Sequence, residues 1–280
     1  MQKAHNTPQI SVLMSVYNPD SREIFFDAVK SIVSQTFRDW EMILYDNGSS
    51  REKSGMIKEA AALDSRIIYM RRDVNNGIGA ALNEAIKISS GRYIARMDAD
   101  DISKPERFSR QYEFLEQNPQ YQWVGSNAEL INSKGRWAVW CMPKEPDSKD
   151  FLRFSPYIHP SVMFRREILE RCGGYPEKNG RAEDYMLFMY LHSKGFRGYN
   201  LQKVLFAYRE DRTSYKRRKF SAWLSEMKIR YSGFKMLGIL NFKTFFYVIK
   251  PLANWLIPNS FMAAFKSRIR KGTYVERRKG

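Results

Sequence analysis

The sequence predicts an α/β protein with a mostly parallel, doubly wound central sheet. Over residues 9–98, short apolar segments that suit strands alternate with segments of helical hydrophobic spacing, which is the pattern of strand–helix–strand units. Polar residues follow each predicted strand, and the carboxyl ends of parallel strands share one edge of the sheet, where ligands bind. The fold class therefore also predicts where a functional site lies.

The predicted elements of this sheet follow one another through short connections. The first helix is the best marked, because Ser21 suits its N-cap and Glu23 lies in its first turn, where the helix dipole favours an acid. The third helix opens in a Gly-rich turn and is expected to stop at Gly91. In order, the elements are strand 9–18, helix 21–37, strand 40–50, helix 51–63, strand 66–72, helix 75–91 and strand 92–98.

After Asp101 the alternation weakens, and a mixed arrangement that completes the same domain is expected. The glycines at 135, 173 and 195 suit a hairpin turn and two helix ends. The predicted elements are helix 104–119, hairpin 123–140, a short strand and helix within 159–175, and an amphipathic helix within 181–195.

The predicted strand ends are rich in Asn, Asp, Gly and Ser. Their residues are Tyr17–Asn18, Asp46–Ser49, Asn75–Gly77 and Asp98–Asp101. Some of these residues also suit plain turns, because Asp, Asn and Gly tolerate left-handed backbone. The edge that they form is nevertheless the best candidate for a binding site.

The stretch "NNGIGAALN" resembles a phosphate-binding turn before a helix, with Gly77 and Gly79 near the helix N-terminus. Leu82 takes the place of the last glycine of G-x-G-x-x-G, which disfavours a hydride-transfer cofactor. We expect Asn75 and Gly77 at the binding edge and Gly79 in helix–sheet packing.

Three carboxylates crowd the end of the fourth strand, in "RMDADD". Like charges so close raise each other's pKa, and a divalent cation with oxygen ligands relieves that repulsion. Asp98 and Asp100 are therefore candidate ligands of Mn²⁺ or Mg²⁺. The alternative is helix capping, with Asp101 at the N-terminus of a helix from Ser103 onward. A D-x-D spacing alone does not decide between the two.

The net charge of +17 over 280 residues is concentrated near the C-terminus. Residues 203–280 hold 19 Lys and Arg against 4 Asp and Glu, whereas residues 1–202 hold 28 against 26. Such asymmetry suggests a polyanionic partner, which is a nucleic acid, a diphosphate ligand or an anionic membrane. The two cysteines, Cys141 and Cys172, make a disulfide framework unexpected, and no signal peptide is recognised.

The chain resembles inverting glycosyltransferases of family 2, which have the A-type glycosyltransferase fold. Matching stretches follow in the family's order from Gln9 to about Ser214. Each is degenerate, and their combination in register makes the resemblance specific. They are "SVLMSVYN", "SIVSQTFRDWEMILYDNGSS", "NNGIGAALNEAI", "GRYIARMDADD", "HPSVMFRREILERCGGY" and "AEDYMLFMYL".

The resemblance implies roles for individual residues. Asp100 matches the metal ligand of the family, and Asp98 matches a contact to the ribose or the metal shell. Asp184 matches the general base, while the neighbouring Glu183 is expected to orient the acceptor. Loops that hold the base and ribose match Tyr17, Asn18, Asp46 and Asn47, although the family often has Asp where Asn47 stands.

Helix capping is again the alternative for Glu183 and Asp184, because the pair starts a predicted helix. His159 is assigned a contact to the acceptor, with core packing as the alternative. Arg209 and Arg212 match a loop over the diphosphate in relatives, with a solvated basic surface as the alternative. The Gln-x-x-Arg-Trp motif of processive members is missing, which favours transfer of a single sugar.

The tail combines aromatic and basic residues. Residues 244–265 are apolar, but Lys250 and two prolines interrupt them, so attachment to an anionic membrane surface is favoured over a spanning helix. The alternative is a helical pair packed on the catalytic domain. Nucleic-acid binding is not expected, since no motif of a nucleic-acid-binding fold is found.

The resemblance, together with the acidic pairs, implies a metal-dependent, inverting transferase that acts on a nucleotide diphosphate sugar, with UDP favoured as the nucleotide. The acceptor is expected to be a lipid-linked saccharide of a surface polysaccharide, at the inner face of the cell membrane. Residues 1–215 form the expected catalytic domain, with a nucleotide-sugar half to about residue 101 and an acceptor half after it, and residues 216–280 form the basic tail. A metal-dependent nucleotidyltransferase and a non-catalytic polyanion-binding module remain as alternatives.

Overall fold

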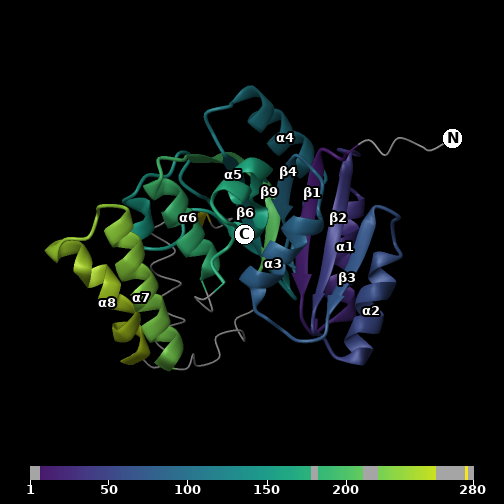
Figure 1. Ribbon diagram of the computed structural model, residues 1–280, viewed down its shortest axis with the longest axis horizontal. Coiled ribbons are helices and arrows are strands. Elements are labelled where there is room, and N and C mark those ends of the chain that lie inside the picture. The colour runs from purple at the N-terminus through teal and green to yellow at the C-terminus, as the bar shows by residue number, and fades with distance from the viewer. Residues whose placement is uncertain (1–6, 178–181, 211–219, 257–274, 277–280) are drawn as a thin grey trace.

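The computed structural model describes residues 7–177, 182–210, 220–256 and 275–276, and Figure 1 shows a central sheet with helices around it. The helices are α1 (Arg22–Val33), α2 (Arg51–Ala61), α3 (Ile78–Ile88), α4 (Arg107–Gln117), α5 (Arg166–Arg171), α6 (Glu183–Ser193), α7 (Phe220–Met236) and α8 (Phe242–Leu256), with short 3-10 turns η1 (Asp150–Leu152) and η2 (His159–Ser161). The strands are β1 (Ile10–Val16), β2 (Trp40–Asn47), β3 (Ile67–Arg72), β4 (Tyr93–Arg96), β5 (Ile102–Ser103), β6 (Trp123–Asn132), β7 (Gly135–Trp140), β8 (Met163–Arg165), β9 (Gly198–Arg209) and β10 (Val275–Glu276).

The sheet has a parallel half and a mixed half. Its main path runs β10-β7-β6-β8-β4-β1-β2-β3, and the strands from β4 to β3 are all parallel. In the register of this half, Val12 of β1 pairs with Met42 of β2 on one side and Ala95 of β4 on the other. β8 is antiparallel to both β4 and β6, while β9 is parallel to β6 and antiparallel to β5. The predicted fold class is confirmed, including the mixed second part.

Both faces of β1 and β2 are buried, which explains their nearly continuous apolar sequences. On β1, Val12 and Met14 lie in one core cluster with residues of α1, whereas Leu13 lies in another with residues of α3. Because successive side chains of a strand point to opposite faces, α1 and α3 cover opposite sides of the sheet. The strand ends between these two layers are thereby held at fixed positions.

The starts of the helices agree with the sequence better than their ends. The Ser21 side chain accepts a hydrogen bond from the Ile24 N–H (3.3 Å), as an N-cap does. The first helix ends at Val33 and the third at Ile88, both earlier than predicted. Gly91 does not end the third helix. A glycine is required there because a Cβ would lie 2.5 Å from the backbone nitrogen of Ser11 on β1.

β9 has no counterpart among the predicted elements. Its sequence "GYNLQKVLFAYR" contains Asn, Gln and Lys in the middle, which hides the alternation of a strand. The strand is stabilised by pairing with β6 along most of its length. It therefore depends on partners that are distant in the sequence, and it carries Arg209 to the end of β4.

The described part of the tail is a helical hairpin, α7–α8, that packs on α6. Figure 1 shows it at the opposite end of the molecule from α2 and β3. Ile229 and Phe234 of α7 are buried in the same core cluster as residues of α6. The Arg230 guanidinium donates to the backbone oxygen of Leu152 at 3.1 Å. Of the two alternatives for the tail, the packed helical pair accordingly describes residues 220–256. None of the helices in the described part of the chain has the length and apolar character to cross a bilayer.

Candidate active site

The ends of β1 and β2 are joined by a reciprocal pair of hydrogen bonds. The backbone N–H of Asn18 donates to Ser49 Oγ, and the backbone N–H of Ser50 donates to Asn18 Oδ1, both at 2.9 Å. Asn18 adopts a left-handed conformation with φ 45°, which Asn tolerates better than most residues. The neighbouring Tyr17 side chain is 54% exposed, so its ring is available to a ligand.

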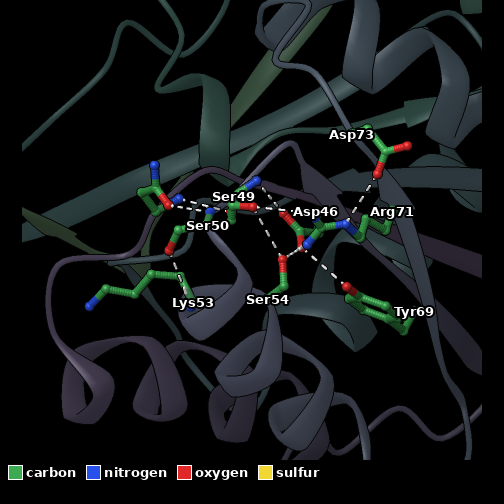
Figure 2. Close-up of polar contacts among 9 residues, drawn as sticks. Asp46, Ser49, Ser50, Lys53, Ser54, Tyr69, Arg71 and Asp73 are labelled. Carbon is green, nitrogen blue, oxygen red and sulfur yellow. Dashed lines mark hydrogen bonds and ion pairs between the residues drawn. The ribbon is translucent and has the colours of Figure 1, made fainter.

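Asp46, near the end of β2, is bonded through both of its carboxylate oxygens, as Figure 2 shows. One of its oxygens accepts from the Ser49 N–H at 2.9 Å, and the other accepts from the Tyr69 hydroxyl at 3.1 Å and pairs with Arg71 at 3.2 Å. The Ser54 hydroxyl also donates to it. Because the side chain is completely buried, these bonds fix the turn that follows β2.

The ends of β2 and β3 meet through asparagine side chains. Asn47 Nδ2 donates to Asn75 Oδ1 and to the Gly77 carbonyl oxygen, each at 3.3 Å, and Asn47 Oδ1 accepts from the Asn76 N–H at 3.3 Å. An amide side chain can donate and accept hydrogen bonds at once, whereas a carboxylate can only accept them. These bonds explain why position 47 holds asparagine and not aspartate. Gly79 lies apart from this group, and a Cβ there would meet the Pro176 oxygen at 2.9 Å. It is in close packing as predicted, but against the segment after α5 and not against the sheet.

The acidic cluster after β4 is balanced by two arginines. Arg96, only 1% exposed, forms an ion pair with Asp98 at 2.5 Å. Arg209 of β9 donates from Nε to the Asp100 backbone oxygen at 2.8 Å, and its backbone N–H donates to Asp101 Oδ1 at 2.7 Å. The alternative that Asp101 caps a helix is wrong, since α4 begins at Arg107 and Asp101 is bonded to β9 instead.

These arginines leave part of the repulsion in place. Burial and then the charge of Asp98 raise the pKa of Asp100 to about 6. Burial, followed by the charges of Asp98 and Asp100, also raises the pKa of Asp101 well above its usual range. Within the described residues, the buried Oδ2 of Asp101 has no hydrogen-bond partner. The cluster therefore has an excess of negative charge and suits a cation.

The fit to a divalent metal ion is good but incomplete. Carboxylate oxygens are ligands that Mg²⁺ and Mn²⁺ accept, and Asp98 and Asp100 supply them. The described part of the chain contains no group of three His, Cys, Asp or Glu residues that would hold a metal alone. A metal here needs further oxygen ligands from a bound diphosphate, which is the usual arrangement for Mg²⁺ at phosphates.

The second acidic pair starts α6, directly after Ala182, whose φ of 72° is left-handed. Burial and the charge of Asp184 raise the pKa of Glu183 to about 7. Burial likewise raises the pKa of Asp184. Asp98 contributes to both shifts in the same direction, and Arg96 opposes both. The second acidic pair therefore shares its electrostatic surroundings with Asp98 and Arg96 of the first.

His159 and Tyr175 line the same region. His159 Nε2 and the Tyr175 hydroxyl are 2.9 Å apart, and both side chains are buried. Burial, with the positive charge of Arg96, holds the pKa of His159 well below its usual range, so the imidazole is neutral. Burial raises the pKa of Tyr175, which Glu183 and Asp98 raise further. The predicted contact of His159 to an acceptor stays a prediction.

Sequence reasoning did not single out Arg96 or Tyr175. A charged residue inside the apolar strand "RYIARMD" was the available signal, because a strand buried on both faces accepts an arginine only with a partner. For Tyr175, no comparable signal exists in the sequence. Arg212, predicted to lie over the diphosphate, falls outside the described residues.

Known proteins share the sequence pattern and the fold of this chain. The model of the family "Glycosyl transferase family 2" matches residues 11–173. The chain is 31% identical over 276 residues to EpsE of Bacillus subtilis (strain 168), covering 98% of this chain and 97% of EpsE. It is 28% identical to the UDP-Gal:alpha-D-GlcNAc-diphosphoundecaprenol beta-1,3-galactosyltransferase of Escherichia coli (95% and 98% covered) and 28% identical to the amylovoran biosynthesis glycosyltransferase AmsE of Erwinia amylovora (94% and 99% covered).

Solved structures share the fold at lower identity. S. aureus TarS 1–349 in complex with UDP-GlcNAc superposes with a TM-score of 0.65 at 17% identity, over 85% of this chain and 72% of that one. The mannosyltransferase PcManGT from Pyrobaculum calidifontis, in complex with GDP-Man and Mn²⁺, gives 0.61 at 17% identity, over 95% and 81%. The fold is therefore of the A-type glycosyltransferase class, and the chain belongs to glycosyl transferase family 2.

Proposed function

We propose that this protein is an inverting glycosyltransferase that moves one sugar from a UDP-sugar to a hydroxyl of a lipid-linked saccharide. The observation that carries the proposal is that two acidic pairs, Asp98 and Asp100 after β4 and Glu183 and Asp184 at the start of α6, both interact with the charge of Arg96. In-line displacement at an anomeric carbon needs a base that takes the acceptor proton and, on the opposite side, positive charge that stabilises the departing diphosphate. The second acidic pair suits the first role, and a cation held by the first pair suits the second.

The donor's nucleoside is assigned to the loops after β1, β2 and β3. Tyr17 is exposed for stacking against the base, and the Asn18 and Asp46 loops are tied together by Ser49. Asn47 and Asn75 hold the next loop through hydrogen bonds to the Gly77 carbonyl and N–H. Nothing lies within 4 Å of the Cβ position of Gly77, so the space beside it is free for a ligand. The complexes of TarS with UDP-GlcNAc and PcManGT with GDP-Man support a nucleotide sugar as the donor.

Asp100 and Asp98 would hold Mn²⁺ or Mg²⁺, and Arg209 would assist at the diphosphate together with Arg212. When bound, the metal neutralises negative charge on the departing nucleoside diphosphate. The Arg209 Nε donates to the backbone oxygen of Asp100, which holds the guanidinium beside the proposed metal ligands. The positive charge of Arg209 would therefore act on the same phosphates as the metal. The Mn²⁺ in the PcManGT complex supports this assignment.

Asp184 is assigned as the general base that takes the proton of the acceptor hydroxyl. Burial raises its pKa, which makes its carboxylate a stronger base. Glu183, which is 8% exposed, is assigned to orienting the acceptor. His159, which is hydrogen-bonded to the Tyr175 hydroxyl, is assigned to a contact with the acceptor.

The acceptor is assigned from the relatives, and with it a place in surface-polysaccharide biosynthesis. The E. coli relative acts on a sugar carried by diphosphoundecaprenol, and AmsE acts in amylovoran biosynthesis. An acceptor of this kind would be met at the inner face of the cell membrane, which the enzyme would approach from the cytoplasm as a peripheral protein.

A donor screen tests the reaction. Purified protein, a synthetic lipid diphosphate-linked sugar and a panel of nucleotide sugars are incubated with Mn²⁺, Mg²⁺ or EDTA, and nucleoside diphosphate release is measured. We expect release from one UDP-sugar, its loss with EDTA, and a product whose anomeric configuration by NMR is opposite to that of the donor. Pyrophosphate release would indicate a nucleotidyltransferase, binding without turnover would indicate a binding module, and retained configuration would contradict the role of Asp184.

A further inference from the structure

Helix α8 is apolar on two opposite faces. On the inner face, Val248 is 3% exposed and Tyr247 packs against the core cluster shared with α6. On the other side are Phe242, Phe245, Phe246 and Ile249, which we call the α8 outer face. Their spacing of three, four and seven residues places them in one stripe along the helix.

The exposure of the α8 outer face exceeds what folding alone explains. Phe242 is 98% exposed, Phe246 60%, Phe245 46% and Ile249 39%. Single exposed apolar residues are ordinary, but a contiguous stripe that contains three phenylalanines marks an interaction site. The helix lies at the end of the molecule opposite α2 and β3 (Figure 1).

The charge around the α8 outer face is positive. α8 contains Lys243 and Lys250 and no acidic residue. Lys228 and Lys235 of α7 are exposed on the same hairpin. Within residues 220–256, which the structure describes, five basic residues stand against one acidic residue, Glu226. A second copy of this positively charged surface would repel the first. A bilayer surface with phosphate head groups over an apolar layer complements both the positive charge and the exposed phenylalanines.

We infer that the α8 outer face is a membrane-docking surface that lies in the interface of a bilayer rich in anionic lipid. The phenylalanines would enter the boundary between head groups and acyl chains, while the lysines contact phosphates. With 15 residues α8 is too short to span a bilayer, so it lies along the surface. The inference deepens the proposed function. It rests on that function only in one respect, which is that docking would give the enzyme access to a lipid-linked acceptor.

The test uses the full-length protein and vesicles without donor or acceptor. Vesicles of phosphatidylcholine alone are compared with vesicles that also contain phosphatidylglycerol, and bound protein is measured by co-sedimentation at low and high salt. Binding is expected only to the anionic vesicles and should weaken with salt. The double variant Phe242→Gln/Phe246→Gln should bind more weakly, by roughly tenfold for each phenylalanine that is removed from the bilayer.

Leu63→Gln/Ile88→Gln is the matched control, because both residues are 42% exposed and lie outside the α7–α8 hairpin, Leu63 just after α2 and Ile88 at the end of α3. It should bind vesicles as the wild type does. Transfer to a water-soluble acceptor should be unchanged in both variants, so a failure of docking is distinguishable from a failure of the proposed reaction. Equal binding of the Phe variant and the wild type, or no wild-type binding to anionic vesicles, would overturn the inference. So would a wild-type dimer, seen by analytical ultracentrifugation, that the Phe variant dissociates.

Discussion

At the scale of single residues, Arg96 connects the acidic groups of the site. Its guanidinium pairs with Asp98 and opposes the raised pKa values of Asp100, Glu183 and Asp184. The guanidinium of Arg96 therefore offsets part of the negative charge of these carboxylates. The carboxylates around it can then remain close together without a complete set of hydrogen bonds.

The base assignment predicts different effects for the two acids of α6. Asp184→Asn should lower kcat by about 10²–10⁴-fold, because the acceptor proton then has no base. The dissociation constant for UDP, measured by calorimetry with Mn²⁺, should stay as in the wild type. Glu183→Gln should mainly raise the KM for the acceptor. The reverse pattern, with kcat lost only in Glu183→Gln, would assign the base to Glu183.

The pKa of Glu183 predicts a pH-dependent stability. Burial raises this pKa from 4.5 to about 7, so between these values the folded protein binds more protons than the unfolded chain. The stability that Glu183 contributes is complete below pH 4.5 and is lost as the pH rises through 7. The Glu183→Gln variant does not lose this stability at high pH, because glutamine does not titrate. Its advantage in free energy of unfolding should therefore grow from pH 5 to pH 8, by at most on the order of 3 kcal/mol.

Denaturant titrations of both proteins in metal-free buffer measure this difference. The comparison at pH 5 serves as the internal reference, because Glu183 is protonated there and resembles glutamine in charge. A difference between the two proteins that stays constant from pH 5 to pH 8 would show that Glu183 titrates as an exposed carboxyl does.

At the scale of elements, the loops after β2 and β3 fit together because one position is glycine. Gly48 has φ 83°, and a Cβ there would lie 2.6 Å from the Asn75 nitrogen and 2.8 Å from the Val74 carbonyl carbon. Both obstacles are backbone atoms, which cannot rotate away as a side chain can. The contact between Asn47 and Asn75 depends on this close approach.

Gly48→Ala should therefore destabilise the protein by about 2 kcal/mol or more, from left-handed strain and the backbone clash together. UDP affinity should fall as well, since the two loops separate. Gly55→Ala is the matched control, because Gly55 lies in α2 and a Cβ there would meet nothing within 4 Å. That change should stabilise the protein by about 0.5–1 kcal/mol. Chemical denaturation measures both, and a neutral Gly48→Ala would contradict the close approach.

β9 shows how an element with a weak local pattern completes a site. Its pairing with β6 and β5 brings Arg209 to the acidic cluster, more than a hundred residues along the chain from Asp100. The short β5 follows the cluster directly and pairs with β9 at Ile102 and Ser103. The position of the arginine is therefore fixed by the strand register and not by a flexible loop.

At the scale of the whole molecule, the α7–α8 hairpin shares a core with the catalytic sheet. Phe234 of α7 is fully buried, in the cluster that also contains Trp123 of β6 and Phe188 of α6. A hairpin joined in this way should unfold together with the rest of the protein. The predicted boundary at residue 215 between a catalytic domain and a separate tail stays a prediction.

Phe234→Ala tests this shared core. The substitution should cost about 3–5 kcal/mol, as for a fully buried phenylalanine. Phe242→Ala, in the exposed position of the same hairpin, should change stability by less than about 0.5 kcal/mol in the absence of lipid. Far-ultraviolet circular dichroism in urea gives both values. A small effect of Phe234→Ala would mean that the hairpin is held only loosely.

The parallel half of the sheet was predictable because its signals are local. Near-continuous apolar strands, the Ser21 cap and polar strand ends are each visible within a few residues, and they placed Asn18, Asp46, Asn47 and Asn75 correctly at one edge. The pairing partners of these residues were not predictable, because a hydrogen bond such as that between Asp46 and Tyr69 depends on strand register.

The sequence by itself determined the α/β class, the family and the two acidic pairs, because these depend on residue identity and short-range spacing. Only the tertiary structure decided that Arg96 and Arg209 balance the first pair, that Tyr175 and His159 lie near the second, and that α8 has an exposed apolar face beside a packed one. The physical reason is that burial and charge proximity belong to a side chain's three-dimensional surroundings. Those surroundings come from segments that are far apart along the chain.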